Sequence, residues 1–90
     1  MLPKFLQDKN LTTPLHEACR YGFEDIVTVL TGRGASMIAQ DNEGNTPLHI
    51  ASRWGHADIV EQLLEKGADE TITNTAGLIY SDLVNFFLIS

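Results

Sequence analysis

The chain contains a single cysteine, Cys19, so no disulfide bond can form within it. No apolar run reaches the roughly 18–20 residues that a membrane-spanning helix needs. Charged residues follow closely after the N-terminal methionine, which is not typical of a secretory signal peptide. From these absences we expect an intracellular protein, cytoplasmic or nuclear, that has no membrane partner.

Basic residues are also scarce, with six Lys and Arg against twelve Asp and Glu and a formal net charge of −6. Nucleic-acid binding depends on cations that neutralise phosphates, so this balance argues against a nucleic-acid partner. A glycine-rich phosphate-binding loop is missing as well. We therefore expect neither a nucleotide nor another cofactor.

What the chain does have is an internal repeat. When residues 8–40 are laid on residues 41–73, 14 of the 33 positions are identical without a gap. The identities fall at expected helix caps, helix breakers and apolar helix positions. The 90 residues and the 43% apolar content fit one small folded domain built from this repeat.

The two copies carry Thr13-Pro14-Leu15-His16-Glu17-Ala18 and Thr46-Pro47-Leu48-His49-Ile50-Ala51. This pattern and the period of 33 residues resemble the ankyrin repeat, whose signature is T-P-L-H-x-A. The resemblance implies an all-α solenoid of helix-turn-helix units joined by β-hairpin-like fingers. We expect residues 1–7 to be a partial leading finger, 8–40 and 41–73 to be full repeats, and 74–90 to be a degenerate capping half-repeat.

Helices are expected at about 14–21, 24–31, 47–54, 57–66 and 80–88. Ile26, Val27 and Leu30 should form the apolar face of the second helix, because their spacing is helical. The last unit departs from the pattern, since Ile79-Tyr80-Ser81-Asp82 stands where the signature would be. Its largely apolar end, residues 83–89, is expected to fold back on the second repeat or to contact another molecule.

His16 and His49 suggest metal or acid–base chemistry, but a structural role is the stronger interpretation. Each follows a capping Thr by three residues and can bond to it locally. Equivalent positions in stacked repeats lie near 10 Å apart, too far for a shared metal. An enzyme that uses Cys19 with His16 is the alternative, although no third orienting residue or oxyanion motif accompanies the pair.

Residues outside the repeat signature are the candidates for binding a partner. Tyr21 and Trp54 occupy equivalent positions, each preceded by an arginine, and Phe87 follows one period later. The resemblance implies that this part of the first helix in each unit faces the concave side. A structural alternative for Trp54, in which the ring covers the finger bases with Arg stacked on it, stays equally open. The full set of candidates is Arg20, Tyr21, Arg53, Trp54, Asn42, Glu43, Asn45, Arg33, Lys66 and Phe87.

The sequence therefore predicts a non-enzymatic protein–protein interaction module or scaffold that binds a partner protein through its concave helical face and its fingers. Two and a half repeats with an apolar end also favour self-association, because solenoids generally need about three repeats for stability. We expect a homo-oligomer formed through that end or through uncapped repeat ends.

Overall fold

A computed structural model describes residues 10–89, with side chains described up to residue 84. It contains five helices: α1 (Pro14–Tyr21), α2 (Glu24–Gly32), α3 (Pro47–Arg53), α4 (Ala57–Glu65) and α5 (Tyr80–Ile89). Their bounds agree with the expected helices within one residue. No strand is assigned in this part of the chain, so the fold is all-α, as predicted.

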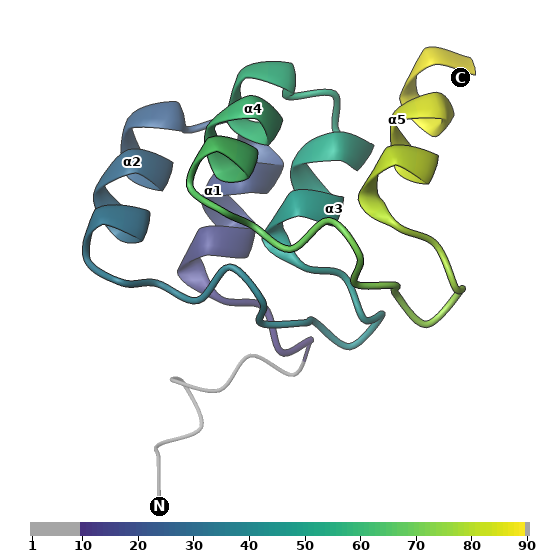
Figure 1. Ribbon diagram of the computed structural model, residues 1–90, viewed down its shortest axis with the longest axis horizontal. Helices are drawn as coiled ribbons and strands as arrows, with labels where there is room; N and C mark the ends of the chain where they lie inside the picture. The colour runs from purple at the N-terminus through teal and green to yellow at the C-terminus, as the bar shows by residue number, and fades with distance from the viewer. Residues whose placement is uncertain (1–9, 90) are drawn as a thin grey trace, which may run out of the picture.

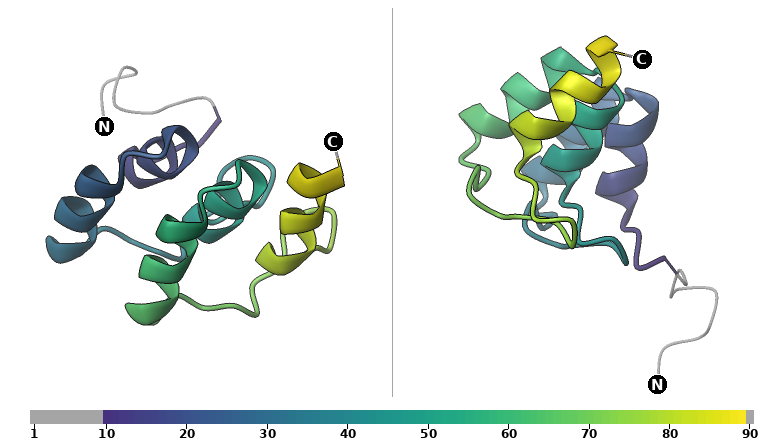
Figure 2. Two further views of the ribbon diagram at one scale, coloured as in Figure 1. Left: turned by 90° about the horizontal axis from the view of Figure 1, so that it is seen from above. Right: turned by 90° about the vertical axis from the view of Figure 1, so that its right-hand side faces the viewer.

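The helices form two layers. In one layer, which we call the inner layer, α3 packs against both α1 and α5. In the other, the outer layer, α4 packs against α2. The connections at residues 33–46 and 66–79 run together beneath the helices (Figure 1). We call these two connections the fingers. Figure 2 shows that α2 accompanies α1 and that α4 accompanies α3, whereas among the described residues no such helix accompanies α5.

Local sequence explains where α1 and α3 begin. Thr13 and Thr46 are extended N-caps, and each accepts a hydrogen bond from the backbone N–H of the histidine three residues later. The histidine returns the contact through Nδ1, which accepts from the backbone N–H of the Thr at 3.1 Å. A proline at the first helical position loses no hydrogen bond there. The caps therefore fix both helix starts without help from distant residues.

The same histidines connect one unit to the next. Because Nδ1 accepts a hydrogen bond from the Thr amide, the neutral ring carries its proton on Nε2. His16 Nε2 then donates to the carbonyl of Asn45 at 2.8 Å, and His49 Nε2 donates to the carbonyl of Leu78 at 2.9 Å. Both links join residues 29 positions apart. Each histidine thus caps its own helix and holds the following finger.

The core lies between the two layers and is made of short aliphatic side chains. Leu15, Leu48, Ile59 and Leu63 are its largest apolar members, each at most 1% exposed. One expectation is wrong here: Ile26 is 49% exposed, whereas Ile59, its equivalent, is buried. Ile59 lies on α4, which packs against α2, but the described residues place no helix on the other side of α2.

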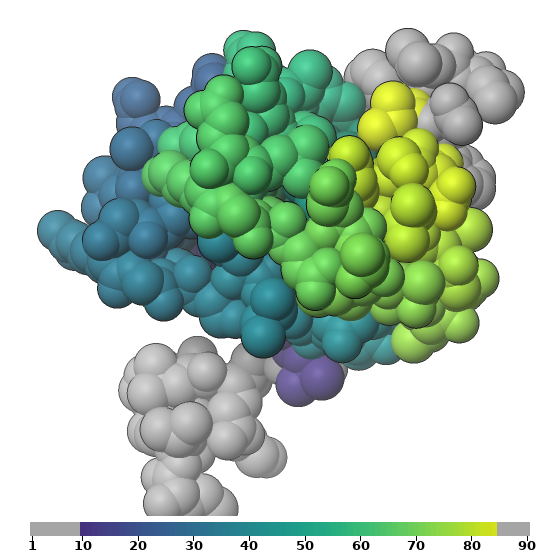
Figure 3. Space-filling view, viewed as in Figure 1, coloured from purple at the N-terminus to yellow at the C-terminus, as the bar shows by residue number. Residues whose placement is uncertain are grey.

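The fingers are stacked on each other through backbone and side-chain hydrogen bonds. The Asp41 carboxylate accepts from the amides of Glu43 and Asn45, both at 2.9 Å, and closes the first turn. Asn74 Oδ1 closes the second turn in the same way, by accepting from the amides of Ala76 and Leu78 at 3.0 Å. The tips are hairpin-like turns without assigned strands. In the space-filling view α4 and the finger that follows it, in green, form the centre of the visible face (Figure 3).

Candidate functional site

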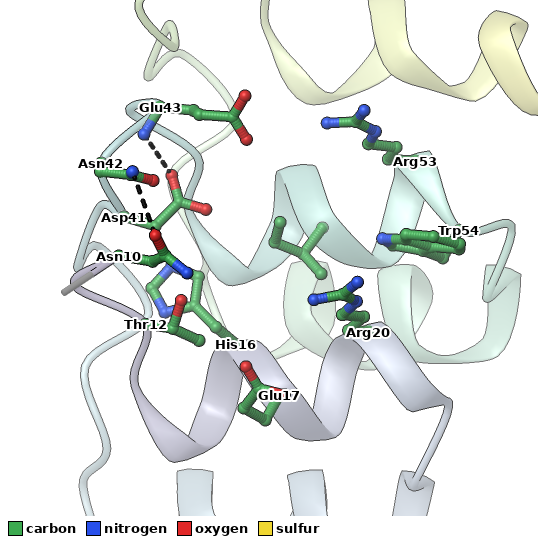
Figure 4. A pocket seen from close by; sticks show the side chains of 11 residues that line it. Asn10, Thr12, His16, Glu17, Arg20, Asp41, Asn42, Glu43, Arg53 and Trp54 are labelled. Carbon is green, nitrogen blue, oxygen red and sulfur yellow. Dashed lines mark hydrogen bonds between the residues drawn. The ribbon is translucent and has the colours of Figure 1, made fainter. Parts of the chain in front are cut away.

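A hollow of about 380 Å³ lies between the inner helices and the first finger. We call it the concave hollow. Helices α1 and α3 form its floor and one wall, and residues 41–43 of the finger form the opposite wall (Figure 4). The residues that line it are Asn10, Thr12, His16, Glu17, Arg20, Asp41, Asn42, Glu43, Ile50, Arg53 and Trp54.

Aromatic and guanidinium groups gather at the C-terminal ends of α1 and α3. The Arg20 Cζ atom lies 5.6 Å from the centroid of the Tyr21 ring and 5.3 Å from that of Trp54. This contact joins the first unit to the second through a cation–π arrangement. Both rings nevertheless keep much of their surface, since Tyr21 is 57% and Trp54 43% exposed. The structural alternative, Arg stacked on a ring, therefore holds for Arg20 and still leaves an exposed indole.

Arg20 and Arg53 lie in the last turns of α1 and α3, where their positive charge suits the negative end of the helix dipole. Within residues 10–89 neither guanidinium forms an ion pair with a carboxylate. Arg53 is exposed and lines the concave hollow beside Trp54 (Figure 4). The guanidinium groups of Arg20 and Arg53 can therefore bind an external anion without first breaking an internal salt bridge.

The opposite wall of the concave hollow is acidic. Asp41 and Glu43 come from the finger, and a third carboxylate, Glu17, lies on the side of the helices, in the first turn of α1. Asn42 is held in place, because its backbone N–H donates to the backbone carbonyl of Asn10 at 2.8 Å. The finger side of the hollow thus carries Asp41 and Glu43, whereas the arginines lie at the far ends of α1 and α3 and Glu17 lies on α1 itself (Figure 4). A surface of this kind favours a ligand that carries both signs of charge in the opposite order.

Asn45 does not belong to this surface, so its assignment as a partner contact is wrong. Its residue is only 2% exposed, and its Oδ1 accepts a hydrogen bond from Asn74 Nδ2 at 3.0 Å. The Asn45 carbonyl also accepts from His16. Asn45 therefore joins the two fingers and the first helix. Its side-chain oxygen is already hydrogen-bonded within the molecule and is not available to a partner.

Three other candidates lie away from the concave hollow or outside the described side chains. Arg33 and Lys66 are exposed C-caps of α2 and α4, in the outer layer of helices. The Lys66 ammonium donates to Thr31 Oγ1, which ties α4 to α2. Phe87 falls within α5, but its side chain lies outside the described part of the chain.

The residues considered for catalysis are arranged for structure. His16 uses both ring nitrogens, one toward Thr13 and one toward Asn45. Cys19 is fully buried, and burial raises the pKa of its thiol to about 12. A nucleophilic cysteine needs the opposite shift, toward a thiolate at neutral pH. The geometry therefore gives no support to a Cys19/His16 pair.

Sequence reasoning missed two residues that line the concave hollow, the half-buried Glu17 and the buried Ile50, and one exposed aromatic residue, Phe23. Glu17 and Ile50 line the concave hollow, and they occupy the variable position of the repeat signature, one turn before the arginines. Phe23 is 55% exposed, and its ring lies 5.9 Å from that of Tyr21. The signal for Glu17 and Ile50 was their difference within an otherwise identical hexapeptide.

The described residues also bear on membrane-spanning and metal-binding functions. Among residues 10–89 no helix is long and apolar enough to cross a membrane. The same part of the chain brings no three His, Cys, Asp or Glu side chains together as a candidate metal site.

Comparison with known proteins gives one result. A family model described as ankyrin repeats, in three copies, matches residues 2–74. No curated protein matches the chain significantly.

Proposed function

Because the chain belongs to the ankyrin repeat family, whose members are generally protein–protein interaction modules, we propose that it binds a partner protein through the concave hollow. Arg20, Arg53 and Trp54 are the central contacts in this proposal. Tyr21, Asn42 and Glu43 extend the contact surface at its edges. The proposed role is non-catalytic: a stacked scaffold holds these side chains in fixed positions, so that little ordering is needed on binding.

The observation that carries the proposal is that the two arginines lie near Trp54 without a carboxylate partner among the described residues. Arg20 is held against the Trp54 ring, and neither Arg20 nor Arg53 is paired with a carboxylate in the described chain. Exposed arginine and tryptophan side chains side by side are the residue types that dominate binding energy in interfaces. A purely structural role does not require the indole to stay 43% exposed.

The charges in the concave hollow define the partner that fits. A carboxylate or phosphorylated side chain would lie at Arg20 and Arg53, because guanidinium groups bind such oxygens with two parallel hydrogen bonds. A lysine or arginine would lie some residues away, near Asp41 and Glu43. We propose a partner segment with these two features in that order, in contact with the indole of Trp54 between them.

Affinity capture with the wild-type chain, followed by mass spectrometry, would supply the partner. Its dissociation constant would then be measured by calorimetry for wild type, Arg53→Ala and Trp54→Ala. We expect each substitution to weaken binding by about 10- to 100-fold, since interface anchors contribute about 2 kcal/mol or more.

Two matched controls separate this surface from general effects of charge and apolar area. Arg33→Ala removes the same charge from an exposed position outside the hollow, and Ile38→Ala removes an exposed apolar side chain. Both should change the dissociation constant by less than about twofold. Unchanged binding by Arg53→Ala and Trp54→Ala, with wild-type circular dichroism, would refute the proposal.

A further inference from the structure

A second, more apolar depression lies on the other side of the molecule from the concave hollow, between α4 and α5. Its volume is about 570 Å³, and we call it the outer groove. The small side chains of Ala51 and Ser52 on α3 form its floor, and Val60 and Leu64 on α4 form one wall. Val84 on α5, which is 36% exposed, forms the other wall. The groove lies beside α5, at the place where the described residues put no helix of the outer layer (Figure 2).

The molecule itself shows what fits such a surface. One unit earlier the equivalent face of α2 is covered by α4, and Val27 on that face is completely buried. Its equivalent on α4, Val60, stays partly exposed. The covering helix α4 also donates from Gln62 and Lys66 to Thr28 and Thr31. The outer groove is therefore shaped by the repeat to receive one helix, with polar groups along its edge.

There is room for one helix but not for a helical pair. Helix α5 packs against α3 as α3 packs against α1, so the inner-layer position of the third unit is occupied. A second copy stacked in the register of the repeat would bring α1 into that position together with α2. Because α5 blocks it, a single helix from another protein is the better occupant than a second copy of this chain.

The charges around the groove define the polar side of that helix. Glu61 and Glu65 are exposed, line the groove and lie four residues apart on α4, so their carboxylates face the same side. The positions equivalent to them on α2 are the neutral Thr28 and Gly32. No Lys or Arg is among the described residues that line the groove. The edge is thus complementary to a basic helix, in contrast to the neutral α2–α4 contact.

One buried polar atom lies at the floor of the groove. Ser52 is 2% exposed, and its Oγ has no hydrogen-bond partner in the described structure. A buried hydroxyl without a partner costs free energy, and few native groups remain in that state. Cys19 fills the same position in the first repeat, where a weakly polar thiol tolerates burial.

From these features we propose that the outer groove binds an amphipathic helix of a partner protein. The helix carries aliphatic side chains at positions i, i+3 or i+4, and i+7, which contact Val60, Leu64 and Val84. Lys or Arg residues beside that stripe pair with Glu61 and Glu65. This site is separate from the concave hollow, so the chain would bridge two binding partners or two segments of one partner.

The test uses a synthetic helical peptide of about 14 residues, with a leucine stripe at that spacing and lysines along one edge. Its affinity for the full chain would be measured by fluorescence anisotropy, and its position by amide chemical-shift changes in NMR spectra. We expect saturable binding, with the largest shifts at residues 51–65 and 84. The double variant Glu61→Lys/Glu65→Lys should weaken binding by at least about tenfold, because two attractions become repulsions.

A control double variant, Glu24→Lys/Glu70→Lys, changes the net charge equally at exposed residues outside the groove. It should retain nearly wild-type affinity. Equal losses in the two double variants would overturn the proposal, since binding would then follow net charge alone. Shift changes centred on the concave hollow, or no saturation up to about 1 mM peptide, would also overturn it. So would a dimer of the free chain that the Glu61→Lys/Glu65→Lys variant dissociates, because the occupant would then be a second copy.

Discussion

Position 19 and its equivalent, position 52, show how one site in the repeat is used twice with different chemistry. Both side chains are buried on the inner helices, one as a thiol and one as a hydroxyl. The thiol meets the requirements of a small apolar group, whereas the hydroxyl is left without a partner. For Cys19 this environment has a measurable effect, because burial disfavours the charged thiolate.

We predict that Cys19 reacts slowly with thiol reagents in the folded chain. Its pKa is raised from 9.0 to about 12, so the thiolate fraction near pH 8 falls by roughly a thousandfold. Rates with iodoacetamide would be compared for the folded chain and for the chain in denaturant, where labelling should be fast. Rapid labelling of the folded chain would instead support the enzymatic alternative.

The same shift links stability to alkaline pH. Because the folded-state pKa of Cys19 lies above the unfolded value, folding favours the protonated thiol. The contribution of this group to the free energy of unfolding is therefore fully present below the unfolded pKa. It is lost as the pH rises through the folded value of about 12. We therefore expect the Cys19 thiol to have no effect on the pH dependence of the denaturant midpoint near pH 7. In strongly alkaline solution its ionisation should lower the midpoint.

Among the connecting elements, the fingers depend on a glycine that is packed against the next finger. Gly44 has a φ of +77°, and a Cβ atom there would lie 2.7 Å from the backbone nitrogen of Thr75. That nitrogen donates to the Glu43 carbonyl at 3.0 Å, and Thr75 Oγ1 donates to the same carbonyl at 2.9 Å. The close approach of the two fingers therefore requires a residue without a side chain.

We predict that Gly44→Ala lowers the free energy of unfolding more than Gly34→Ala does. Gly34 has a φ of +87° but no heavy atom within 4 Å of an added Cβ, so it reports backbone strain alone. That strain costs about 1–2 kcal/mol in both variants. Gly44→Ala should cost about 1–2 kcal/mol more, since it displaces the hydrogen bonds to Glu43. Urea denaturation of the two variants would measure the difference, and equal losses would show that the finger contact contributes nothing.

How well the elements could be predicted from sequence depended on how local their causes are. The starts of α1 and α3 follow from Thr, Pro and His within four residues, and these were predicted correctly. Asn45 was misplaced because its burial depends on Asn74 and His16, each 29 residues away in sequence. A turn residue that varies between copies is usually exposed, and only the stacked structure shows that this one is enclosed.

For the candidate site, the arginine and aromatic positions were chosen because the repeat leaves them without a structural assignment, and their part in binding stays a prediction. Glu17 and Ile50 were missed because they stand inside the signature that identifies the fold. The exposure of Ile26 was not predictable from helical spacing either. Spacing identifies the apolar side of α2, but the neighbour that covers that side is a property of the whole stack.

At the scale of the whole molecule, the described residues give α2 an exposed apolar surface at the first unit. Ile26 is 49% and Val29 47% exposed on this helix, and Tyr21 and Phe23 are exposed just before it. Adjacent exposed aliphatic and aromatic side chains are a common feature of association surfaces. This observation extends the expectation of self-association from the apolar end of the chain to its first unit.

We therefore predict that the free chain self-associates with rising concentration through the outer face of α2. Light scattering across micromolar to millimolar concentrations should show a mass above that of the monomer, and Ile26→Glu should restore the monomer. Glu70→Gln serves as a control at an exposed residue remote from that face. A monomeric mass over the whole concentration range would contradict the prediction.

The hydrogen bond from each histidine to the next finger has a consequence for engineering longer arrays. In α1 and α3 the donor is a side chain of one unit and the acceptor is a backbone carbonyl of the next, so the next unit needs no particular side chain there. This explains how the third unit can lose its signature and still attach. In that unit Asp82 occupies the position of the histidine and accepts from the Ile79 amide at 3.0 Å. An ionised carboxylate has no proton to donate, so a repeat grafted beyond α5 would lack this bond unless Asp82 were first changed to histidine.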